Sequence, residues 1–335
     1  MSIYVFSPHS NIPYGGIRVF YRYVDILNKN GFDAYIVHDK PNFRCEWFEN
    51  DTQIAYVDKI ISFLRKKKSH NDVYLKWPLR KILPNDYMVI PAIHSQKLVE
   101  LAKGVKKIIF NQGCYAVFSR YFFDEEKIIA PFDHEDVISA IVVSKDSYNY
   151  LNYVFPHIPI HRHFNSISLD LFSYQIKKKK QICYMPKAHT KDIRQVINIL
   201  KLRSALKDFE LVPIIDKSEK EVASIMKESA IFLSFSHAEG FGLPPVEAMA
   251  CGCIVIGYHG QGGREYFNPE FSFPIEEGDI VTFSKTIENV ILDYDLKKQC
   301  FDRKIKLARD FVEKNYSPTK EEENVLNFWN SMTKN

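Results

Sequence analysis

Long apolar runs are missing from this chain of 335 residues. No stretch approaches the roughly 20 apolar residues that a membrane-spanning helix needs. No basic stretch precedes the short apolar run after Met1, so we expect a first strand there and not a signal peptide. Cysteine is also scarce, with six residues scattered along the chain, which favours buried, reduced thiols in a cytosolic protein over a disulfide framework. The one close pair, Cys251 and Cys253, has no second pair to complete a zinc site and indicates a tight helix-to-strand turn.

A strong excess of one charge is absent as well, because the formal net charge is +4. The basic residues are nevertheless grouped into three runs, Arg65–Lys68, Lys76–Lys81 and Lys177–Lys180. A run of this kind is usually a solvated face or a linker. The alternative is a polyanionic partner, namely an anionic membrane, a phosphorylated acceptor or nucleic acid.

The chain does contain short runs rich in Val, Ile, Phe and Tyr, which alternate with longer segments of helical period. This pattern predicts parallel strands joined by crossover helices, and the length favours two domains. We therefore predict an α/β protein with two successive doubly wound units, whose ligands bind beyond the carboxyl ends of the strands. The predicted strands are Ile3–Ser7, Ala34–His38, Met88–Ile93, Lys107–Asn111 and Ile138–Val143, followed by Gln181–Met185, Leu211–Ile215, Ile231–Phe235 and Ile254–Tyr258.

The densest motif follows the predicted strand Ile231–Phe235 and reads Glu-Gly-Phe-Gly-Leu-Pro-Pro-Val-Glu-Ala-Met-Ala-Cys-Gly from Glu239 onward. Its glycines allow a close backbone approach, and its two prolines suit the first turn of a helix. A helix N-terminus with free N–H groups suits a phosphate or a pyrophosphate. Glu239 and Glu247 flank that position and would accept hydrogen bonds from hydroxyls of a sugar and of a ribose. The alternative makes Glu247 a dipole-favoured residue of the first turn and Glu239 an ordinary loop carboxylate.

This run resembles the signature of the retaining GT-B glycosyltransferases of family 4, the glycosyl transferases group 1. The resemblance covers nearly the whole chain and is poorest at about residues 40–85. It extends to four further segments, which are Tyr14-Gly15-Gly16, Val143-Ser144 with Asn165–Phe172, Gly262–Glu265, and Asn315–Pro318 with the helix after it.

The resemblance implies two Rossmann-like domains that face each other across a cleft. Residues 1–170 would form the acceptor side, residues 171–317 would bind the nucleotide sugar, and the helix at 318–335 would cross back to the first domain. The implied reaction moves a hexose from a nucleotide diphosphate sugar to a glycan or a lipid-linked acceptor with retention of configuration, and without cofactor or metal. We expect a cytoplasmic enzyme, with a peripheral contact at the inner face of the membrane as an option that the basic runs suggest.

The resemblance also assigns roles to residues. Glu239 would contact the donor sugar and Glu247 the ribose. Lys187 would take the place of an Arg that the family uses to neutralise the leaving diphosphate, with Lys191 or Arg194 as the second cation. The family's histidine near the donor sugar has no counterpart here, since Asn111 and Gln112 end the corresponding strand. The remaining donor-binding positions are glycines and backbone groups, at Gly15, Gly16, Gly240, Phe241, Gly242 and Leu243.

Other functions fit less well. A dehydrogenase would need Gly-x-Gly-x-x-Gly after the first strand, which this sequence lacks. Asp293-Tyr294-Asp295 imitates the metal-binding acidic pair of the other glycosyltransferase fold but lies between two predicted helices. A hydrolase with paired carboxylates has no use for the glycine loop. A nucleotide-sugar epimerase on the same fold, a non-catalytic binding module, and a glycosyltransferase acting on nucleic acid or protein remain as alternatives.

Overall fold

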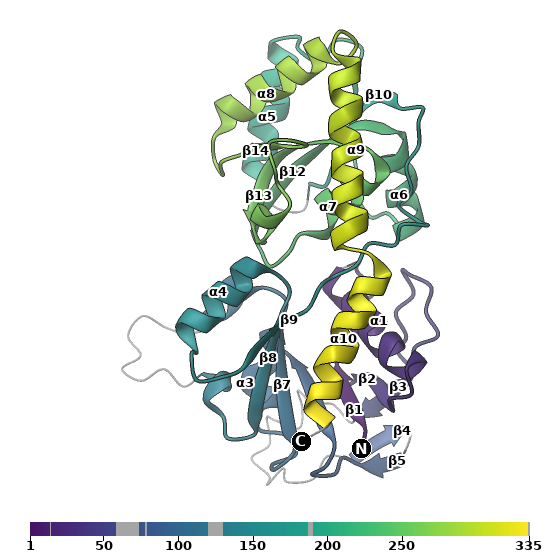
Figure 1. Ribbon diagram of the computed structural model, residues 1–335, viewed down its shortest axis with the longest axis vertical. Coiled ribbons are helices and arrows are strands. Elements are labelled where there is room, and N and C mark those ends of the chain that lie inside the picture. Colours follow the sequence, from purple (N-terminus) through teal and green to yellow (C-terminus); the bar gives the residue numbers. More distant parts are fainter. Residues whose placement is uncertain (14, 58–73, 78, 120–129, 187–189, 334–335) are drawn as a thin grey trace. The chain divides into compact units, whose positions relative to one another are not determined.

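The computed structural model describes residues 1–13, 15–57, 74–77, 79–119, 130–186 and 190–333. They form two compact units. Unit 1 comprises Met1–His163 with Glu322–Asn335, and unit 2 comprises Phe164–Glu321. Each unit is built on its own β-sheet with helices on both faces (Figure 1), which confirms the predicted α/β class with two doubly wound sheets.

The described strands of unit 1 form one sheet in the order β5-β4-β3-β2-β1-β6-β7-β8-β9. The strands from β3 to β9 in this order are parallel, and β4 and β5 add an antiparallel hairpin at one edge. Their bounds are β1 Ile3–Phe6, β2 Ala34–His38, β3 Ile54–Val57, β4 Tyr74–Trp77, β5 Leu79–Lys81, β6 Tyr87–Pro91, β7 Lys106–Asn111, β8 Val137–Val142 and β9 Ile160–Arg162.

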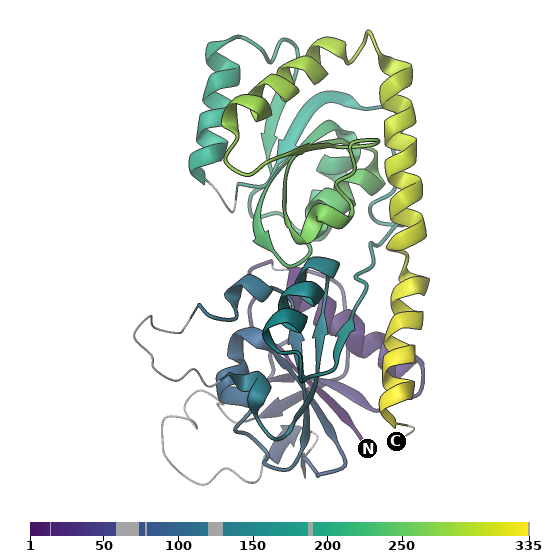
Figure 2. The same cartoon turned by 60° about the vertical axis from the view of Figure 1, so that its left-hand side comes forward.

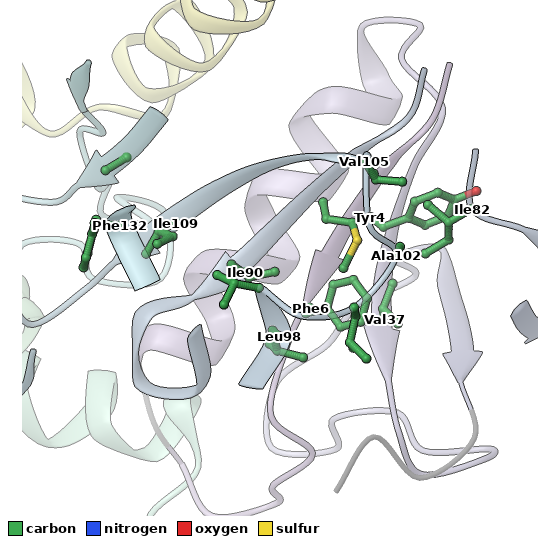
Figure 3. Close-up of a cluster of buried hydrophobic side chains, with 14 of the residues drawn as sticks. Tyr4, Phe6, Val37, Ile82, Ile90, Leu98, Ala102, Val105, Ile109 and Phe132 are labelled. Atoms are coloured by element: carbon green, nitrogen blue, oxygen red, sulfur yellow. The ribbon is translucent and has the colours of Figure 1, made fainter. Parts of the chain in front are cut away.

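Both faces of the unit 1 sheet are covered. Alternate residues of every strand point to opposite faces, so each face contributes buried side chains. Tyr4 and Phe6 of β1 belong to a buried cluster with Val37, Ile90 and Leu98, drawn as sticks in Figure 3. On the other face, Tyr23 of α1 packs against Phe110 and accepts a hydrogen bond from Trp329 of α10 at 2.7 Å. The helical elements that contribute to unit 1 are α1 Gly15–Lys29, η1 Ala92–His94, α3 Ser95–Leu98, η2 Cys114–Ala116, η3 Pro131–Asp133, α4 Lys145–Val154 and α10 Pro318–Thr333, the last of which begins in unit 2.

The described strands of unit 2 form a smaller, fully parallel sheet in the order β11-β10-β12-β13-β14. Helices α5 and α8 pack side by side on one face (Figure 2), while α7 packs with α6 and α9. The strands are β10 Lys179–Tyr184, β11 Glu210–Pro213, β12 Ser229–Glu239, β13 Ile254–Gln261 and β14 Phe273–Ile275. The helical elements are α5 Thr190–Leu202, α6 Glu219–Glu228, α7 Leu243–Cys251, η4 Gly262–Glu265, α8 Ile280–Asp293 and α9 Lys298–Asn315.

All nine strands predicted from the sequence are confirmed, with ends that move by a few residues. The strand predicted at Met88–Ile93 ends at Pro91, because the chain turns into η1 there. Five of the strands that the structure describes were not predicted, namely β3, β4, β5, β9 and β14. They are three or four residues long, and β14 contains Pro274, which the pattern of a strand disfavours.

Three lysines of the basic run Lys177–Lys180 make contacts within unit 2. The ammonium of Lys178 donates to the backbone oxygens of Lys227 at 2.8 Å and Cys251 at 2.6 Å, at the ends of α6 and α7. Lys179 pairs with Glu228 at 2.6 Å, and Lys180 pairs with Asp208 and Asp295 at 2.6 Å each. These contacts favour the interpretation of this run as a structural segment over the polyanion interpretation.

The other two basic runs cannot be followed in the same way. Arg65–Lys68 lies outside the described residues, and so do most side chains of Lys76–Lys81. Among the helices that the structure describes, none is both long and apolar enough to cross a membrane.

All six cysteines are unpaired thiols. Five are buried as predicted, but Cys300 is exposed near the start of α9, which corrects the expectation for that residue. Cys251 ends α7 and Cys253 precedes β13, with Gly252 in a left-handed conformation between them (φ 83°). The pair therefore lies at a tight helix-to-strand turn, as its spacing predicted.

Candidate functional site

The strand order of unit 2 locates a ligand site. Chain order reverses between β10 and β12, and ligands of open parallel sheets bind at such a switch, beyond the carboxyl ends of the strands. The segment that follows β12 is the loop Gly240–Gly242 and then helix α7. The sequence motif and the topology thus point to the same edge.

The loop before α7 presents free backbone donors. Gly242 caps the helix in a left-handed conformation (φ 81°, ψ 81°), and Leu243 is the first helical residue. The first N–H groups of a helix have no partner within it, and Pro244 and Pro245 carry none. In the described part of the chain, the N–H groups of Gly242 and Leu243 meet no hydrogen-bond acceptor. A left-handed residue followed by right-handed ones makes a concave pair of donors that binds anions.

A second loop, after β13, supports the first from behind. A Cβ on Gly262 would lie 2.2 Å from the carbonyl oxygen of Gly240, so the two loops touch backbone to backbone. A strained residue other than glycine lies at the end of the strand before each loop. Ala238 has φ 45°, and Gln261 has φ 69° and ψ −64°, a rare turn conformation. Strain of this kind tends to persist at functional sites, where the surrounding structure enforces it.

The two carboxylates of the motif have different environments. Glu239 ends β12 and is exposed, yet the protein atoms around its carboxyl group raise its pKa, and nearby His237 partly offsets the increase. His237 itself forms an ion pair with Glu277 from the loop before α8. Glu247 is 5% exposed and is the fifth residue of α7. It therefore lies in the second turn, which weakens the alternative of a dipole-favoured residue in the first turn.

The predicted cations are only partly described. Lys191 and Arg194 are exposed in the first two turns of α5, the helix that follows β10. Between them, Asp192 accepts a hydrogen bond from Tyr258 at 3.1 Å, which ties α5 to β13. Lys187 lies outside the described residues.

The predicted glycine pair belongs to unit 1, whose own order reverses between β1 and β6. Gly15 and Gly16 open α1. The side-chain amide of Gln112, at the end of β7, donates to the carbonyl oxygen of Gly16 at 3.0 Å. Gln112 thus holds the glycine pair, a contact that the sequence did not predict.

Sequence reasoning also missed a set of polar contacts at the carboxyl edge of unit 1. After β1 and β2, His9 and Asp39 pair through Nδ1 and a carboxylate oxygen at 2.5 Å. Beneath them, the buried imidazole of His38 contacts the hydroxyl of Tyr21 at 2.7 Å and the carbonyl oxygen of Ser7 at 3.0 Å. Burial lowers the pKa of His38 to about 4, so its ring is neutral at neutral pH. The signal that could have revealed this set is a polar residue within two positions of the end of each of two predicted strands.

Other candidate sites have simpler explanations. Among the described residues, no group of three or more His, Cys, Asp or Glu side chains could hold a metal ion. Asp293 pairs with Lys297 at 2.8 Å and Asp295 with Lys180, so this acidic pair is engaged on the surface of unit 2. A hollow of about 460 Å³ in unit 1 lies at the amino end of β1, away from the ligand-binding edge. It is lined by Met1, Ser2, Asp33, Lys81, Leu83, Asn85 and Asp86.

Comparison with solved structures defines the class of fold. Sucrose-phosphate synthase from Thermosynechococcus elongatus superposes with a TM-score of 0.71 at 14% identity, over 99% of this chain and 98% of that one. Anabaena Alr3699/HepE, solved with UDP and glucose, superposes with a TM-score of 0.67 at 10% identity, over 99% of this chain and 100% of that one. The chain has the fold of these proteins, which confirms the predicted GT-B class.

A resemblance to a known family is found in the sequence of unit 2. Residues 212–307 match the sequence model of Glycosyl transferases group 1, which confirms the predicted resemblance. The matched segment contains Glu239, Glu247 and the loop between them. An Alpha-1,6-glucosyltransferase of Actinobacillus pleuropneumoniae serotype 7 (strain AP76) is 27% identical over 227 residues, which are 62% of this chain and 64% of that protein. The match thus spans less than two thirds of that relative's length.

Proposed function

We propose that this protein is a glycosyltransferase that moves a hexose from a nucleotide diphosphate sugar to a glycan or a lipid-linked acceptor with retention of configuration. The observation that carries the proposal is the pair of unpaired N–H groups at Gly242 and Leu243, within the segment that matches group 1 glycosyltransferases. Two carboxylates, Glu239 and Glu247, belong to the same segment, so one short stretch of chain offers groups for an anion and for hydroxyls.

The donor would bind unit 2 by its diphosphate. The N–H groups of Gly242 and Leu243 donate to the phosphate oxygens, with Gly240 and Phe241 keeping the backbone close. Glu247 accepts from the ribose hydroxyls, and Glu239 accepts from the sugar. Lys187, with Lys191 or Arg194, neutralises the charge that develops on the leaving diphosphate. Gly15 and Gly16 of unit 1 add backbone donors to the phosphates.

Retention follows if the acceptor attacks from the side that the diphosphate leaves. The bond from the anomeric carbon to the phosphate oxygen breaks, and the acceptor oxygen bonds to that carbon on the same face. The departing phosphate oxygen takes the acceptor proton. The protein then contributes position and charge stabilisation, without a covalent intermediate.

The division of labour that we propose puts the acceptor on residues 1–170 and the donor on residues 171–317, with the helix at 318–335 returning to the first domain. The carboxyl edge of unit 1, with His9 and Asp39, supplies polar groups that suit a sugar acceptor. A location in the cytoplasm, with peripheral contact at the inner face of the membrane, accords with a lipid-linked acceptor.

The decisive experiment incubates the protein with UDP-, GDP- and ADP-sugars, each alone and with candidate acceptors. Transfer of the sugar to an acceptor supports the proposal, and the anomeric configuration of the product, read by NMR, tests retention. A free epimer formed from the donor alone would replace the proposal with an epimerase. No turnover of any donor, despite nucleotide binding, would favour a binding module.

Metal independence needs a separate test. Because fixed cations and helix α7 would stabilise the diphosphate, EDTA should leave the initial rate of transfer unchanged. Loss of activity on chelation, with recovery on adding Mg²⁺ or Mn²⁺, would contradict this part of the proposal.

A further inference from the structure

The hydroxyl of Tyr266 lies directly behind the loop that presents the free N–H groups. Tyr266 follows η4 and has no exposed surface. Its hydroxyl oxygen is 2.7 Å from the carbonyl oxygen of Phe241 and 2.7 Å from that of Gly242. These carbonyls belong to consecutive peptide units, so one phenol proton is shared between two neighbouring acceptors. Burial raises the pKa of Tyr266 far above its ordinary value, so the hydroxyl keeps that proton.

The direction of the carbonyls fixes the direction of the amides. A peptide unit is planar and trans, so its N–H points opposite to its C=O. The carbonyl of Phe241 shares a peptide unit with the N–H of Gly242, and the carbonyl of Gly242 shares one with the N–H of Leu243. Since Tyr266 binds both carbonyls, both N–H groups point away from it. These are the two donors that meet no acceptor within the described residues.

Tyr266 also explains two glycines. A Cβ on Gly242 would lie 2.7 Å from the Tyr266 hydroxyl, and a Cβ on Gly263 would lie 2.9 Å from it. Contacts this short do not occur between real atoms of these types, so the end of the phenol ring fits only because both positions are glycine. The ring is held on its other sides by Phe267 and Tyr316, with ring centroids 5.5 and 6.3 Å away.

We infer that Tyr266 is a positioning residue for the diphosphate of the donor. It binds the rear of the loop through two carbonyls and thereby aims the N–H groups of Gly242 and Leu243 at the phosphates, without touching the ligand itself. The inference rests on the proposed function, because it assigns a diphosphate to these donors. It goes beyond that proposal in assigning the orientation of the anion site to one buried hydroxyl.

The variant Tyr266→Phe removes the hydroxyl and keeps the ring. The carbonyls of Phe241 and Gly242 then lose the hydrogen bond from the phenol, which loosens the orientation of the peptide units they belong to. We expect affinity for a nucleoside diphosphate to fall about 10- to 100-fold, while affinity for the matching nucleoside stays within about twofold. A purely structural role would weaken both ligands together, so the ratio of the two affinities separates the roles.

The measurement uses the full chain, with calorimetry for UDP, GDP and ADP and NMR titration for uridine, guanosine and adenosine. The pair that wild type binds is then used for the variants. Tyr316→Phe is the matched control, because its ring also packs on Phe241, at 5.1 Å, but its hydroxyl donates to the carboxylate of Glu265, at 3.0 Å. It should leave the ratio of affinities at the wild-type value.

The outcomes separate the inference from the proposed function. If wild type binds no nucleoside diphosphate, the proposed function fails and the role of Tyr266 fails with it. If wild type binds but Tyr266→Phe keeps the wild-type ratio, the positioning role alone is wrong. If Tyr266→Phe shows no cooperative thermal transition, Gly263→Ala decides by the same ratio, since its added methyl group displaces the end of the Tyr266 side chain, the hydroxyl together with ring carbon Cζ, from the loop.

Discussion

The carboxyl edges of the two sheets are built in different ways. In unit 2, the loops after β12 and β13 touch backbone to backbone, since a Cβ on Gly262 would lie 2.2 Å from the carbonyl oxygen of Gly240, and the hydroxyl of Tyr266 adds to this contact. In unit 1, side chains do this work, through pairs such as His9 with Asp39 and the amide of Gln112 with the backbone of Gly16.

This difference affects which substitutions each edge tolerates. A backbone contact at a glycine tolerates no side chain, so the edge of unit 2 has few alternatives that keep its shape. A side-chain contact can be exchanged for another without moving the backbone. An edge of the first kind suits a ligand part common to many reactions, such as a diphosphate, and an edge of the second kind suits a partner that differs between enzymes.

The largest expected effect comes from adding one methyl group to the unit 2 edge. Gly262→Ala must separate two loops that now touch, and a displacement of about 1 Å at a reacting centre can cost about 100-fold in rate. We therefore expect kcat/KM for transfer to fall by about 100-fold or more. Gly113→Ala is the matched control in unit 1, because Gly113 is extended (φ −165°) with open space where a Cβ would lie. Equal activity of the two variants would erase the contrast between the edges.

A smaller effect is expected from Glu239→Gln. Hydrogen bonds to an ionised carboxylate that strengthen as the sugar becomes cationic count mainly in the transition state. Turnover should fall about 10- to 100-fold, with donor affinity nearly unchanged. Initial rates at saturating donor, together with calorimetry, measure the two quantities. A turnover within about twofold of wild type, worth some 0.4 kcal/mol, would remove Glu239 from the reaction.

The raised pKa of Glu239 adds a pH dependence with a definite sign. A carboxyl whose pKa is higher in the folded than in the unfolded chain favours folding below its ordinary pKa, and this contribution is lost as pH rises through the raised value. At neutral pH, Glu239→Gln should therefore unfold at the same or a higher temperature than wild type while turning over more slowly. The acidic limb of the turnover profile should lie above the ordinary Glu pKa of about 4.3 and vanish in the variant. A lower melting temperature would contradict the sign.

Glu247→Ala should act on binding and not on turnover. Its carboxylate is buried in α7, and the loss of hydrogen bonds to a ribose should cost about 1–3 kcal/mol, or about 5- to 150-fold in nucleotide affinity. Calorimetry on wild type and variant measures this, and Glu276→Ala, an exposed carboxylate of the same unit, is the control. Unchanged affinity in a folded Glu247→Ala variant would exclude the ribose contact.

The smallest effect belongs to unit 1. Asp39→Asn leaves a hydrogen-bonding amide but removes the charge beside His9, and partly exposed ion pairs contribute about 0.2–1 kcal/mol. We expect KM for the acceptor to rise at most about fivefold, with nucleotide affinity unchanged. A fall in nucleotide affinity as large as that of Glu247→Ala would show that the edge of unit 1 serves the donor as well.

The sequence predicted the parts of this molecule that depend on pattern. Strands such as Ala34–His38 and Ile254–Tyr258 are continuous apolar runs between helical segments, and the motif from Glu239 to Gly252 combines glycines, prolines and carboxylates at a readable spacing. The short edge strands carry no such pattern. Phe273–Ile275 is a strand because β13 lies beside it, and a neighbour in space cannot be read from three residues.

The parts of the site that escaped prediction depend on long-range contacts. Tyr266 is one aromatic residue among many in the sequence, and its role appears only when its hydroxyl is found against the carbonyls of Phe241 and Gly242. Gly263 looked like part of a loop motif, whereas its lack of a side chain makes room for that tyrosine. The pair of His9 and Asp39 joins residues 30 positions apart.

The contact of Lys178 with the end of α7 has an electrical consequence. An α-helix is a dipole, and the ammonium of Lys178 sits 2.6 Å from the backbone oxygen of Cys251, at the negative pole. A diphosphate at Gly242 and Leu243 would sit at the positive pole, about 13 Å away along nine residues of helix. Helix α7 would then have a cation at its C-terminus and an anion at its N-terminus, and each charge would be stabilised by the partial charge of the helix end it faces. Because Lys178 neutralises the carbonyl end of α7, the partial charge that remains is at the N–H end, which faces the proposed ligand.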